Sequence, residues 1–418
     1  MEILQTINFI FAAAFFLCYF YQFFYIPAAL FKKEKPHKPE KKHRFAVLIC
    51  ARNEEKVIGN LIESIRRQTY GMENIRIFVM ADNCTDSTAA AARRAGAFVY
   101  KRFSTDKIGK GFALEALLEN ILRDYPKNYF DGFFVFDADN VLEENYIEEM
   151  NRTFCDGYRI ITSYRNSKNY GDNWISAGYA LWFLRESRYL NGARMLLGNS
   201  CAVSGTGFFF CREILEECGG WPFHLLTEDI EFSVHNIVNG EKIGFCKKAV
   251  LYDEQPTSFR QSWRQRMRWA KGYLQVFGKY GKRLLSGIAK GDFSSFDMTM
   301  NIMPAAVLSV CSVAINSAAA VFALFAGESI LPIVFSAAES LFNMYITLFF
   351  IGAVTTFSEW KRIHTSPVKK IFYTFTFPLF MFTYIPISFA ALFRKVEWKP
   401  ITHSVSVTLA EIRKKKSA

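Results

Sequence analysis

Four long apolar segments at the two ends of this 418-residue chain, with a mixed, globular sequence between them, limit how it can fold. They run from about 4 to 31, 302 to 326, 330 to 357 and 371 to 393. Each is long enough for the ~20 residues that a helix needs to cross a bilayer core. The first is too long for the apolar core of a secretion signal, and it has no small-residue cleavage site. We therefore expect a globular domain fused to membrane helices.

The charges beside these segments predict how the chain is oriented. The basic run KKEKPHKPEKKHR follows the first segment and places the following domain in the cytoplasm. A short Gly-Glu-Ser turn makes the second and third segments a hairpin. The fourth is broken by Pro378 and Pro386, and it either spans the membrane or is interfacial or re-entrant. Spanning would put a basic C-terminal tail outside, against the positive-inside trend. We expect a multi-pass protein of the plasma membrane.

The composition excludes several classes of protein. A net charge of +12 could indicate nucleic-acid binding, but Lys and Arg flank the apolar segments, where they favour the cytoplasmic side and anionic lipid. No nucleic-acid-binding motif is present, so no nucleic-acid partner is expected. The nine Cys form no C-x-x-C pair and the six His are scattered, which predicts reduced thiols and no zinc site.

The middle of the chain, from 44 to about 252, alternates short apolar runs with helical patterns, as in a parallel α/β sheet. Strands are expected at 44–49, 75–80 and 134–136, and helices at 54–68, 88–95, 111–122 and 259–280. In FVFDADN, Asp137 and Asp139 come where the third strand ends. Ligands usually bind in the crevice at this edge, and paired carboxylates suit Mg²⁺ or Mn²⁺ on a diphosphate. A solvated loop is the alternative.

Four further motifs accompany this pair, namely CARNEE and ADNCTDST after the first two strands, LLTEDIEF at 225–232, and QRMRW at 265–269. Together they resemble the family-2 inverting glycosyltransferases of GT-A fold. The resemblance covers about 45–272 and is nearest to the membrane-bound, processive branch of cellulose, hyaluronan, chitin-oligosaccharide and poly-N-acetylglucosamine synthases. It implies an α/β GT-A (Rossmann-like) cytoplasmic domain fused to α-helical transmembrane segments and interfacial helices.

The resemblance also implies a donor site. Asp139 would bind the metal, Mg²⁺ or Mn²⁺, and a second group would contact the nucleotide or its diphosphate: Asn53, Glu54, Asp82, Lys110, Asp137, Arg266 and Arg268. Arg suits a diphosphate because its planar fork donates paired hydrogen bonds. Helix capping is the alternative for Asn53, Glu54 and Asp82, and Lys107 is a rival of Lys110.

The resemblance implies an acceptor site as well. Asp229 matches the general base, although Thr227 could instead begin a helix whose positive end favours Glu228 and Asp229. The implied acceptor-binding residues are Gly205, Thr206, Glu228, Gln265 and Trp269. Gln265 and Trp269 are about one turn apart and share a helix face. The alternative for this helix is an interfacial one, with Arg on lipid phosphate and Trp in the aromatic belt.

Six regions are expected: a transmembrane helix (1–32), a basic linker (33–44), the GT-A domain (45–258), interfacial helices (259–300), C-terminal transmembrane or re-entrant helices (301–395) and a tail (396–418). In the tail, 398–403 loosely resembles the segment that closes over the nucleotide in hyaluronan and cellulose synthases. A juxtamembrane anchor is the equal alternative.

The expected function is processive polymerisation of a UDP-hexose, with UDP-glucose ahead of UDP-N-acetylglucosamine, into an extracellular β-linked polysaccharide that the protein also translocates. The partners would be the UDP-sugar, the growing polysaccharide, membrane lipid and, in a homo-oligomer, a second copy of the chain. One alternative is non-processive transfer of a single sugar to a membrane lipid, and another is a non-catalytic scaffold. By resemblance, Gln-x-x-Arg-Trp tracks with polymer retention, and the intact acids disfavour a scaffold.

Overall fold

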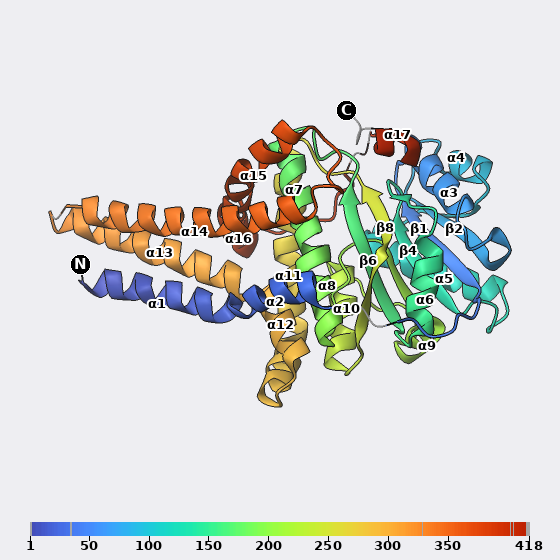
Figure 1. Cartoon of the computed structure of the whole chain (residues 1–418), viewed down its shortest axis with the longest axis horizontal. Coiled ribbons are helices and arrows are strands. Elements are labelled where there is room, and N and C mark those ends of the chain that lie inside the picture. Colours follow the sequence, from blue (N-terminus) through green and yellow to red (C-terminus); the bar gives the residue numbers. More distant parts are fainter. Residues whose placement is uncertain (1, 34–35, 328, 402, 404, 415–418) are drawn as a thin grey trace.

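A mixed eight-stranded sheet forms the centre of the globular part of the molecule (Figure 1). The computed structural model describes residues 2–33, 36–327, 329–401, 403 and 405–414, without the side chains of 2–5, 304 and 306. The strand order is β3-β2-β1-β4-β7-β6-β8-β5. The strands are β1 (Phe45–Ala51), β2 (Ile75–Asp82), β3 (Phe98–Arg102), β4 (Gly132–Asp137), β5 (Val141–Leu142), β6 (Ile160–Ser167), β7 (Phe208–Cys211) and β8 (Ile243–Asp253).

The direction of the strands decides where the functional side chains meet. β1 pairs in parallel with β2 and β4, and β2 pairs in parallel with β3. β7 runs antiparallel between β4 and β6, and β6 is parallel to β8. The carboxyl ends of β1, β2 and β4 therefore lie at one edge, as do the loops that follow them. The three expected strands are confirmed, and β1 and β2 extend two residues further than expected.

Helices surround the sheet and lead to the apolar segments. They are α1 (Glu2–Tyr19), α2 (Tyr21–Phe31), α3 (Ile58–Arg66), α4 (Thr88–Arg94), α5 (Lys110–Asp124), α6 (Tyr146–Cys155), α7 (Trp174–Arg185), α8 (Gly192–Leu197), α9 (Arg212–Glu217), α10 (Glu228–Val238), α11 (Phe259–Ala289), α12 (Phe293–Ile302), α13 (Pro304–Phe325), α14 (Leu331–Ser358), α15 (Pro367–Phe382), α16 (Tyr384–Phe393) and α17 (Leu409–Lys414). A 3₁₀ turn covers Met72–Asn74, and a π-helical segment covers Glu186–Asn191. The four expected helices are confirmed; α3 begins later than expected and α11 continues to Ala289.

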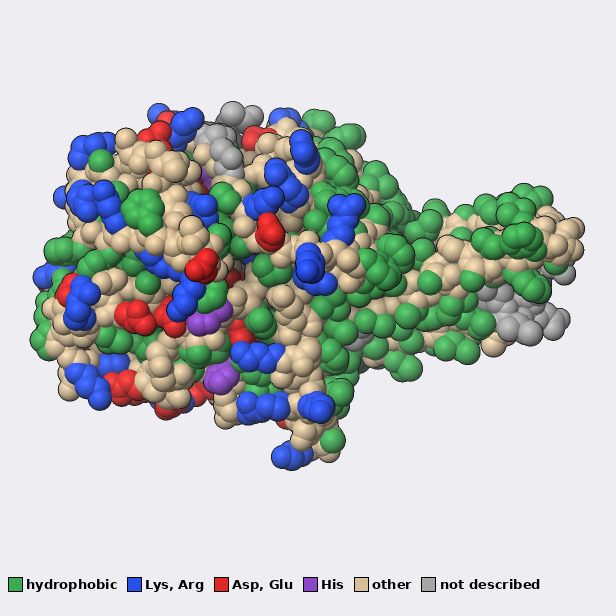
Figure 2. All heavy atoms as spheres, turned by 180° about the vertical axis from the view of Figure 1, so that it is seen from behind, with side chains coloured by type: hydrophobic (Ala, Val, Ile, Leu, Met, Phe, Trp, Pro, Cys, Tyr) green, Lys and Arg blue, Asp and Glu red, His purple; other side chains and the backbone are tan. Residues whose placement is uncertain are grey.

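An arm made of α1, α13 and α14 extends away from the sheet, and α11 and α12 lie between the arm and the sheet (Figure 1). Four helical stretches of the described chain are long and apolar enough to cross a membrane: Thr6–Phe31, Val307–Phe325, Leu331–Ser358 and Pro367–Phe393. Few residues of the first two are buried. On the face seen in Figure 2, the arm shows hydrophobic and uncharged side chains, whereas Lys and Arg are spread over the globular part.

The fourth apolar stretch, Pro367–Phe393, is not part of the arm (Figure 1). α15 and α16 pack on α7, α11 and α14 beside the globular part. Just before them, Glu359 accepts a hydrogen bond from Tyr164 of β6 at 2.6 Å, and after them His403 lies 2.9 Å from Glu54. Both ends of this stretch therefore contact the globular part, which supports the interfacial or re-entrant alternative; the topology itself stays a prediction.

A buried charge cluster fixes the arm to the globular part. The guanidinium of Arg194 in α8 donates to both carboxylate oxygens of Asp297 in α12, at 2.7 and 2.9 Å. Tyr21 and Tyr25 of α2 donate to the same carboxylate at 2.6 and 2.7 Å. Buried charges are stable only when they are paired and hydrogen-bonded, so this cluster sets the position of α2 on the globular part.

Candidate active site

One cavity of about 1190 Å³ runs from the carboxyl edge of the sheet into the arm. At the sheet end it is lined by carboxylates that end or follow β1, β2, β4 and β8 or belong to α10: Glu54, Asp82, Asp137, Asp139, Glu228, Asp229, Asp253 and Glu254. At the arm end it is lined by apolar side chains of α1, α2, α13 and α14, including Phe15, Phe16, Phe20, Val310 and Leu348. The cavity thus joins an acidic compartment to an apolar one.

Lys110 and Asp137 form an ion pair in the acidic compartment. The Nζ of Lys110, at the start of α5, lies 2.5 Å from Oδ1 of Asp137 and donates to the carbonyl of Gly205 at 2.6 Å. Burial lowers the pKa of Lys110, but the charges of Asp137 and Glu228 outweigh it, and the net shift is upward. Gly111 follows, where a Cβ would lie 2.2 Å from the carbonyl oxygen of Phe223. This close approach explains the glycine and places Lys110 over the end of β4.

Asp139 is buried and held by its neighbours. Its Oδ2 accepts a hydrogen bond from the backbone N–H of Glu254 at 2.7 Å, and its carbonyl oxygen accepts from Lys168. Burial alone would raise the pKa of Asp139, but His403, Lys168 and this hydrogen bond lower it. The carboxylate is therefore kept ionised inside the protein, as a metal ligand must be.

The loops after β1 and β2 lie beside each other. Asp82 pairs with Arg102 at 2.5 Å and lines the cavity. Asn53, which has a φ of 59°, does not line the cavity, because its Oδ1 accepts from the backbone N–H of Thr85 at 2.8 Å. Glu54 is buried, and its Oε2 has no hydrogen-bond partner among the described residues.

The C-terminal tail covers this end of the cavity. His403 lies 2.9 Å from Oε1 of Glu54, and Glu254 accepts a hydrogen bond from the backbone N–H of Val405. The ring of Trp398 lies 5.5 Å from the guanidinium of Arg52. Thr402, part of the expected closing segment, lies outside the described residues. The tail therefore lies on the catalytic side of the sheet, which the anchor alternative did not predict.

Asp229 lies in the first turn of α10 and lines the acidic compartment. Its Oδ2 accepts a hydrogen bond from the backbone N–H of Gly205 at 2.6 Å. Glu228 beside it is buried, and burial together with the charge of Asp229 raises the pKa of Glu228. The result is one carboxylate positioned by a backbone donor and a second one that resists ionisation.

One face of α11 borders the cavity. Gln265, Arg268 and Trp269 line it, and Arg268 donates to the carbonyl of Leu226 at 2.6 Å. Oε1 of Gln265 is buried with no hydrogen-bond partner among the described residues. Further along α11, a Cβ on Gly272 would lie 2.5 Å from Oγ1 of Thr227, so glycine lets the helix approach the start of α10.

Trp269 is less available than expected. Its ring lies edge-on to Tyr179 and Phe183, with centroid distances of 5.8 and 6.3 Å. Part of the indole therefore packs on α7, and only the remainder borders the cavity.

Besides Asn53, two of the expected residues do not line the cavity. Arg266 is fully buried, donates to Thr383 at 2.6 Å and to the carbonyl of Phe380, and joins α11 to the α15–α16 pair. This contact takes the place of the expected one with the nucleotide, because a helical neighbour of Gln265 projects about 100° away from it. Thr206 is also buried, and its Oγ1 accepts from the backbone N–H of Asp137 at 2.9 Å. This hydrogen bond holds the backbone of Asp137 in position at the end of β4.

Sequence reasoning missed several polar residues of the cavity. Arg165 of β6 forms an ion pair with Asp253 and donates to the carbonyl of Ser204. Burial raises the pKa of Asp253 to about 6 although Arg165 opposes this. Asp253 ends β8 and Glu254 follows it, just as Asp137 ends β4, so the rule that acids gather where strands end could have identified them.

The donor set fits a divalent ion shared with a substrate. No cluster of three His, Cys, Asp or Glu side chains with metal-binding geometry occurs in the described residues. Mg²⁺ commonly binds through one or two carboxylates together with substrate phosphates. Asp139 and Asp137, with the unpartnered oxygen of Glu54 nearby, supply such a partial set.

Comparisons with known proteins agree with this geometry. A family model described as "Glycosyltransferase like family 2" matches residues 43–272. Beta-monoglucosyldiacylglycerol synthase of Nostoc sp. is 26% identical over 281 residues, which cover 63% of this chain and 57% of that protein. Poly-beta-1,6-N-acetyl-D-glucosamine synthase of Staphylococcus aureus is 23% identical over 234 residues, 55% of this chain and 54% of that protein. The chain thus spans little more than half the length of these relatives.

A solved structure resembles almost the whole chain. The mannosyltransferase PcManGT of Pyrobaculum calidifontis, solved with GDP-Man and Mn²⁺, matches with a TM-score of 0.60 and 16% identity, over 93% of this chain and 99% of that one. Identity at this level supports the fold alone. The expected GT-A fold joined to apolar helices is confirmed.

Proposed function

The chain belongs to the family "Glycosyltransferase like family 2", and from this premise we propose that it is a membrane-bound, inverting hexosyltransferase that transfers one sugar from a UDP-activated donor to a hydroxyl group of a membrane lipid. UDP-glucose is the preferred donor and UDP-N-acetylglucosamine the next. The proposal follows the lipid-acceptor alternative rather than polymerisation. The observation that carries it is the continuous cavity between Asp229 and the arm.

The lining of the cavity favours a lipid over a sugar chain. Phe16, Phe20 and Phe23 line the arm end and are also between 42% and 55% exposed, so this wall of the cavity faces outward, where acyl chains would surround it. Apolar surface is stable against acyl chains, whereas the hydroxyl groups of a polysaccharide would lose hydrogen bonds there. A lipid with its headgroup at Asp229 and its acyl chains along the arm would place its polar part in the acidic compartment and its apolar part in the apolar one.

The relatives support the same choice. The cyanobacterial synthase is named for a lipid that carries one glucose. The staphylococcal synthase is named for a polymer and is less similar. Polysaccharide synthesis remains the second candidate. This staphylococcal relative and the Gln-x-x-Arg-Trp face of α11 that borders the cavity support it.

The acidic compartment would bind the donor. Asp82 and the loop of Glu54 would contact the uridine, and Lys110, Arg268 and Asp137 the diphosphate. Asp139 would hold Mg²⁺ or Mn²⁺, which supplies charge that stabilises the departing diphosphate. Lys110 and Arg268 assist because negative charge grows on that group as the glycosidic bond breaks.

Asp229 would act as the general base. Its carboxylate accepts the proton of the acceptor hydroxyl while that oxygen bonds to the anomeric carbon, and the carbon–oxygen bond to UDP breaks on the opposite face. The hydrogen bond from Gly205 keeps one carboxylate oxygen oriented and leaves the other for the acceptor. Direct displacement inverts the anomeric centre.

A cytoplasmic globular part is included in the proposal, supported by the basic run that follows the first apolar segment. With the arm crossing the bilayer and α15–α16 at its surface, the globular part and the tail lie together on the cytoplasmic side, where UDP-sugars are made available. The expected domain boundaries are retained as part of this proposal.

The test is transfer by the purified full chain in lipid nanodiscs, with radiolabelled UDP-glucose, Mn²⁺ and a total membrane-lipid extract. Label that moves into solvent-extractable lipid carrying a single hexose supports the proposal. Label in a high-molecular-weight, lipase-resistant polymer would instead establish the polysaccharide candidate. Absence of both products with every common UDP-sugar would exclude both.

A further inference from the structure

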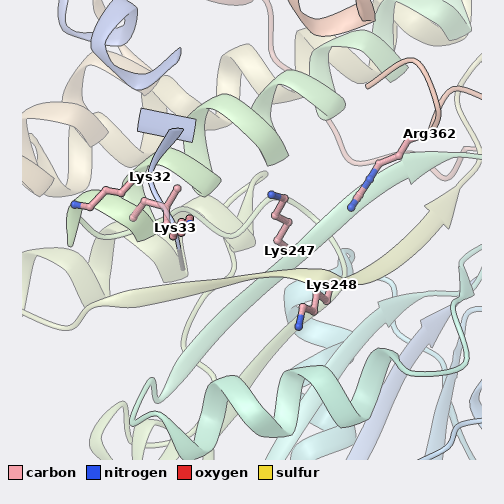
Figure 3. A pocket seen from close by; sticks show the side chains of 6 residues that line it. Lys32, Lys33, Lys247, Lys248 and Arg362 are labelled. Carbon is pink, nitrogen blue, oxygen red and sulfur yellow. The ribbon is translucent and has the colours of Figure 1, made fainter. Parts of the chain in front are cut away.

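A second pocket, of about 310 Å³, lies outside the catalytic cavity. We call it the basic pocket, and it is lined by Lys32, Lys33, Leu196, Lys247, Lys248 and Arg362. None of these residues lines the larger cavity. Three separate stretches of chain contribute the cations: the segment after α2, strand β8 and the segment after α14. In Figure 3, Lys32 and Lys33 lie on one side, Arg362 on the other and Lys247 between them.

The basic pocket holds positive charge that its surroundings do not balance. In the part of the chain that the structure describes, the four lysines form no ion pair with Asp or Glu, and no acid lines the pocket. Arg362 lies 3.5 Å from Glu359, but that carboxylate also pairs with Arg188 at 2.8 Å. Like charges brought together around one hollow repel one another, and a bound anion relieves that repulsion.

The position of the basic pocket identifies the source of the anion. Lys32 directly follows Phe31, which is 81% exposed at the end of the apolar stretch Thr6–Phe31. Arg362 comes shortly after Phe357, which is 69% exposed near the end of Leu331–Ser358. An exposed aromatic ring followed by cations is typical of the membrane interface. Two membrane helices thus end beside this pocket, at the level of the lipid headgroups.

We propose that the basic pocket is a non-catalytic lipid site that binds the phosphate of an anionic phospholipid headgroup. Lysine ammonium groups would bind the phosphate as point charges, and the guanidinium of Arg362 would add directed hydrogen bonds. Basic pockets at the cytoplasmic ends of membrane helices have this chemistry. The site would attach the globular part to the bilayer beside β8, on a different surface from the acceptor cavity.

The test uses the full chain in neutral detergent, titrated calorimetrically with dihexanoylphosphatidylglycerol below its micellar concentration. Saturable binding is expected, together with much weaker binding of dihexanoylphosphatidylcholine. The variant K247Q/K248Q should bind phosphatidylglycerol about 25-fold more weakly, since each surface cation contributes roughly a fivefold factor. Lys248 is exposed, Lys247 is half-buried, and neither belongs to the hydrophobic core, so their replacement leaves the core intact. K32Q/K33Q provides a second variant with the same expected loss.

The matched control is K101Q/K127Q, which removes two exposed lysines that do not line the basic pocket and should bind as the parent does. Saturating UDP with Mn²⁺ should leave the titration unchanged, because the two sites share no lining residue. Equal affinity in all variants, or equal binding of phosphatidylcholine, would overturn the proposal. Inorganic phosphate that competes at the same concentration as the lipid would show a site for soluble anions instead.

Discussion

His403 lies 2.9 Å from Oε1 of Glu54, although 349 residues separate them in the sequence. This contact brings the tail over the loop after β1 and close to Asp139. Burial lowers the pKa of His403, but Asp139 and Glu54 raise it to about 10, so the ring is cationic at neutral pH. The tail therefore contributes positive charge to the compartment in which we place the donor.

Replacing His403 by Ala is expected to release the tail and to weaken donor binding by about tenfold, roughly the contribution of one buried charge-assisted hydrogen bond. The KM for UDP-glucose and the rate of limited proteolysis after residue 397 measure the two effects. Ser406→Ala, which removes only an exposed contact with Asn60, is the control. A protected tail with an unchanged KM would mean that His403 has no part in covering the site.

Replacing Asp229 by Asn should lower the turnover by about 10² to 10⁴, the usual contribution of a general base. The amide has the same shape and can still accept the hydrogen bond from Gly205, but it cannot take the acceptor proton. The affinity for UDP, measured by calorimetry, should stay near the parental value. Near-parental turnover would place the base elsewhere.

Replacing Asp139 by Ala should weaken Mn²⁺-dependent binding of UDP on the order of a hundredfold, because a metal ligand is lost together with a fixed charge. Titrations of UDP with Mn²⁺ and with EDTA separate the metal-dependent part. In the parent, EDTA should have the same effect as the substitution. If the variant keeps its metal-dependent affinity, Asp139 is not the ligand.

Replacing Leu348 by Trp should fill the arm end of the cavity and raise the KM for the lipid acceptor, while UDP affinity stays unchanged. Phe350→Trp is the matched control, because Phe350 is 58% exposed on the same helix and does not line the cavity. Assays with graded mole fractions of acceptor in nanodiscs distinguish the two variants. Equal effects would argue against the arm as the acceptor route.

Replacing Arg268 by Ala should raise the KM for UDP-glucose, because Arg268 lines the donor end of the cavity. Replacing Arg266 by Met should leave that KM unchanged and lower the melting temperature, since its buried contacts hold α15–α16 on α11. Thermal unfolding followed by tryptophan fluorescence gives the second value. A raised KM in the Arg266 variant with normal stability would restore its expected contact with the nucleotide.

Local order along the chain is enough to predict several features of the site. Strands that end at one edge of a parallel sheet bring their following acids together, so the positions of Asp82, Asp137 and Asp139 follow from the sequence alone. The helical period also separates Arg266 from its neighbours on α11, although the family resemblance implied a nucleotide contact for Arg266. Gln265, Arg268 and Trp269 are spaced at i, i+3 and i+4 and share a face, whereas Arg266 falls on another one.

Features that depend on distant parts of the chain could not be predicted in this way. The contact between His403 and Glu54 needs the arm and α15–α16 to bring the tail back to the sheet. The packing of Trp269 on Tyr179 is decided by the crossing of α7 and α11, which no local pattern encodes. The cavity that joins Asp229 to the arm likewise arises only when both ends of the chain meet.

That cavity also decides how the reaction rate would scale. An acceptor that reaches Asp229 along Phe16 and Phe20 is dissolved in two dimensions, whereas UDP-glucose arrives from a three-dimensional solution. Diluting the acceptor with inert lipid would slow the enzyme even when the molarity of acceptor in the test tube is constant. Diluting the whole suspension of vesicles with buffer at constant UDP-glucose would leave the rate per enzyme unaltered. The protein would thus respond to the make-up of its membrane rather than to how much membrane is present.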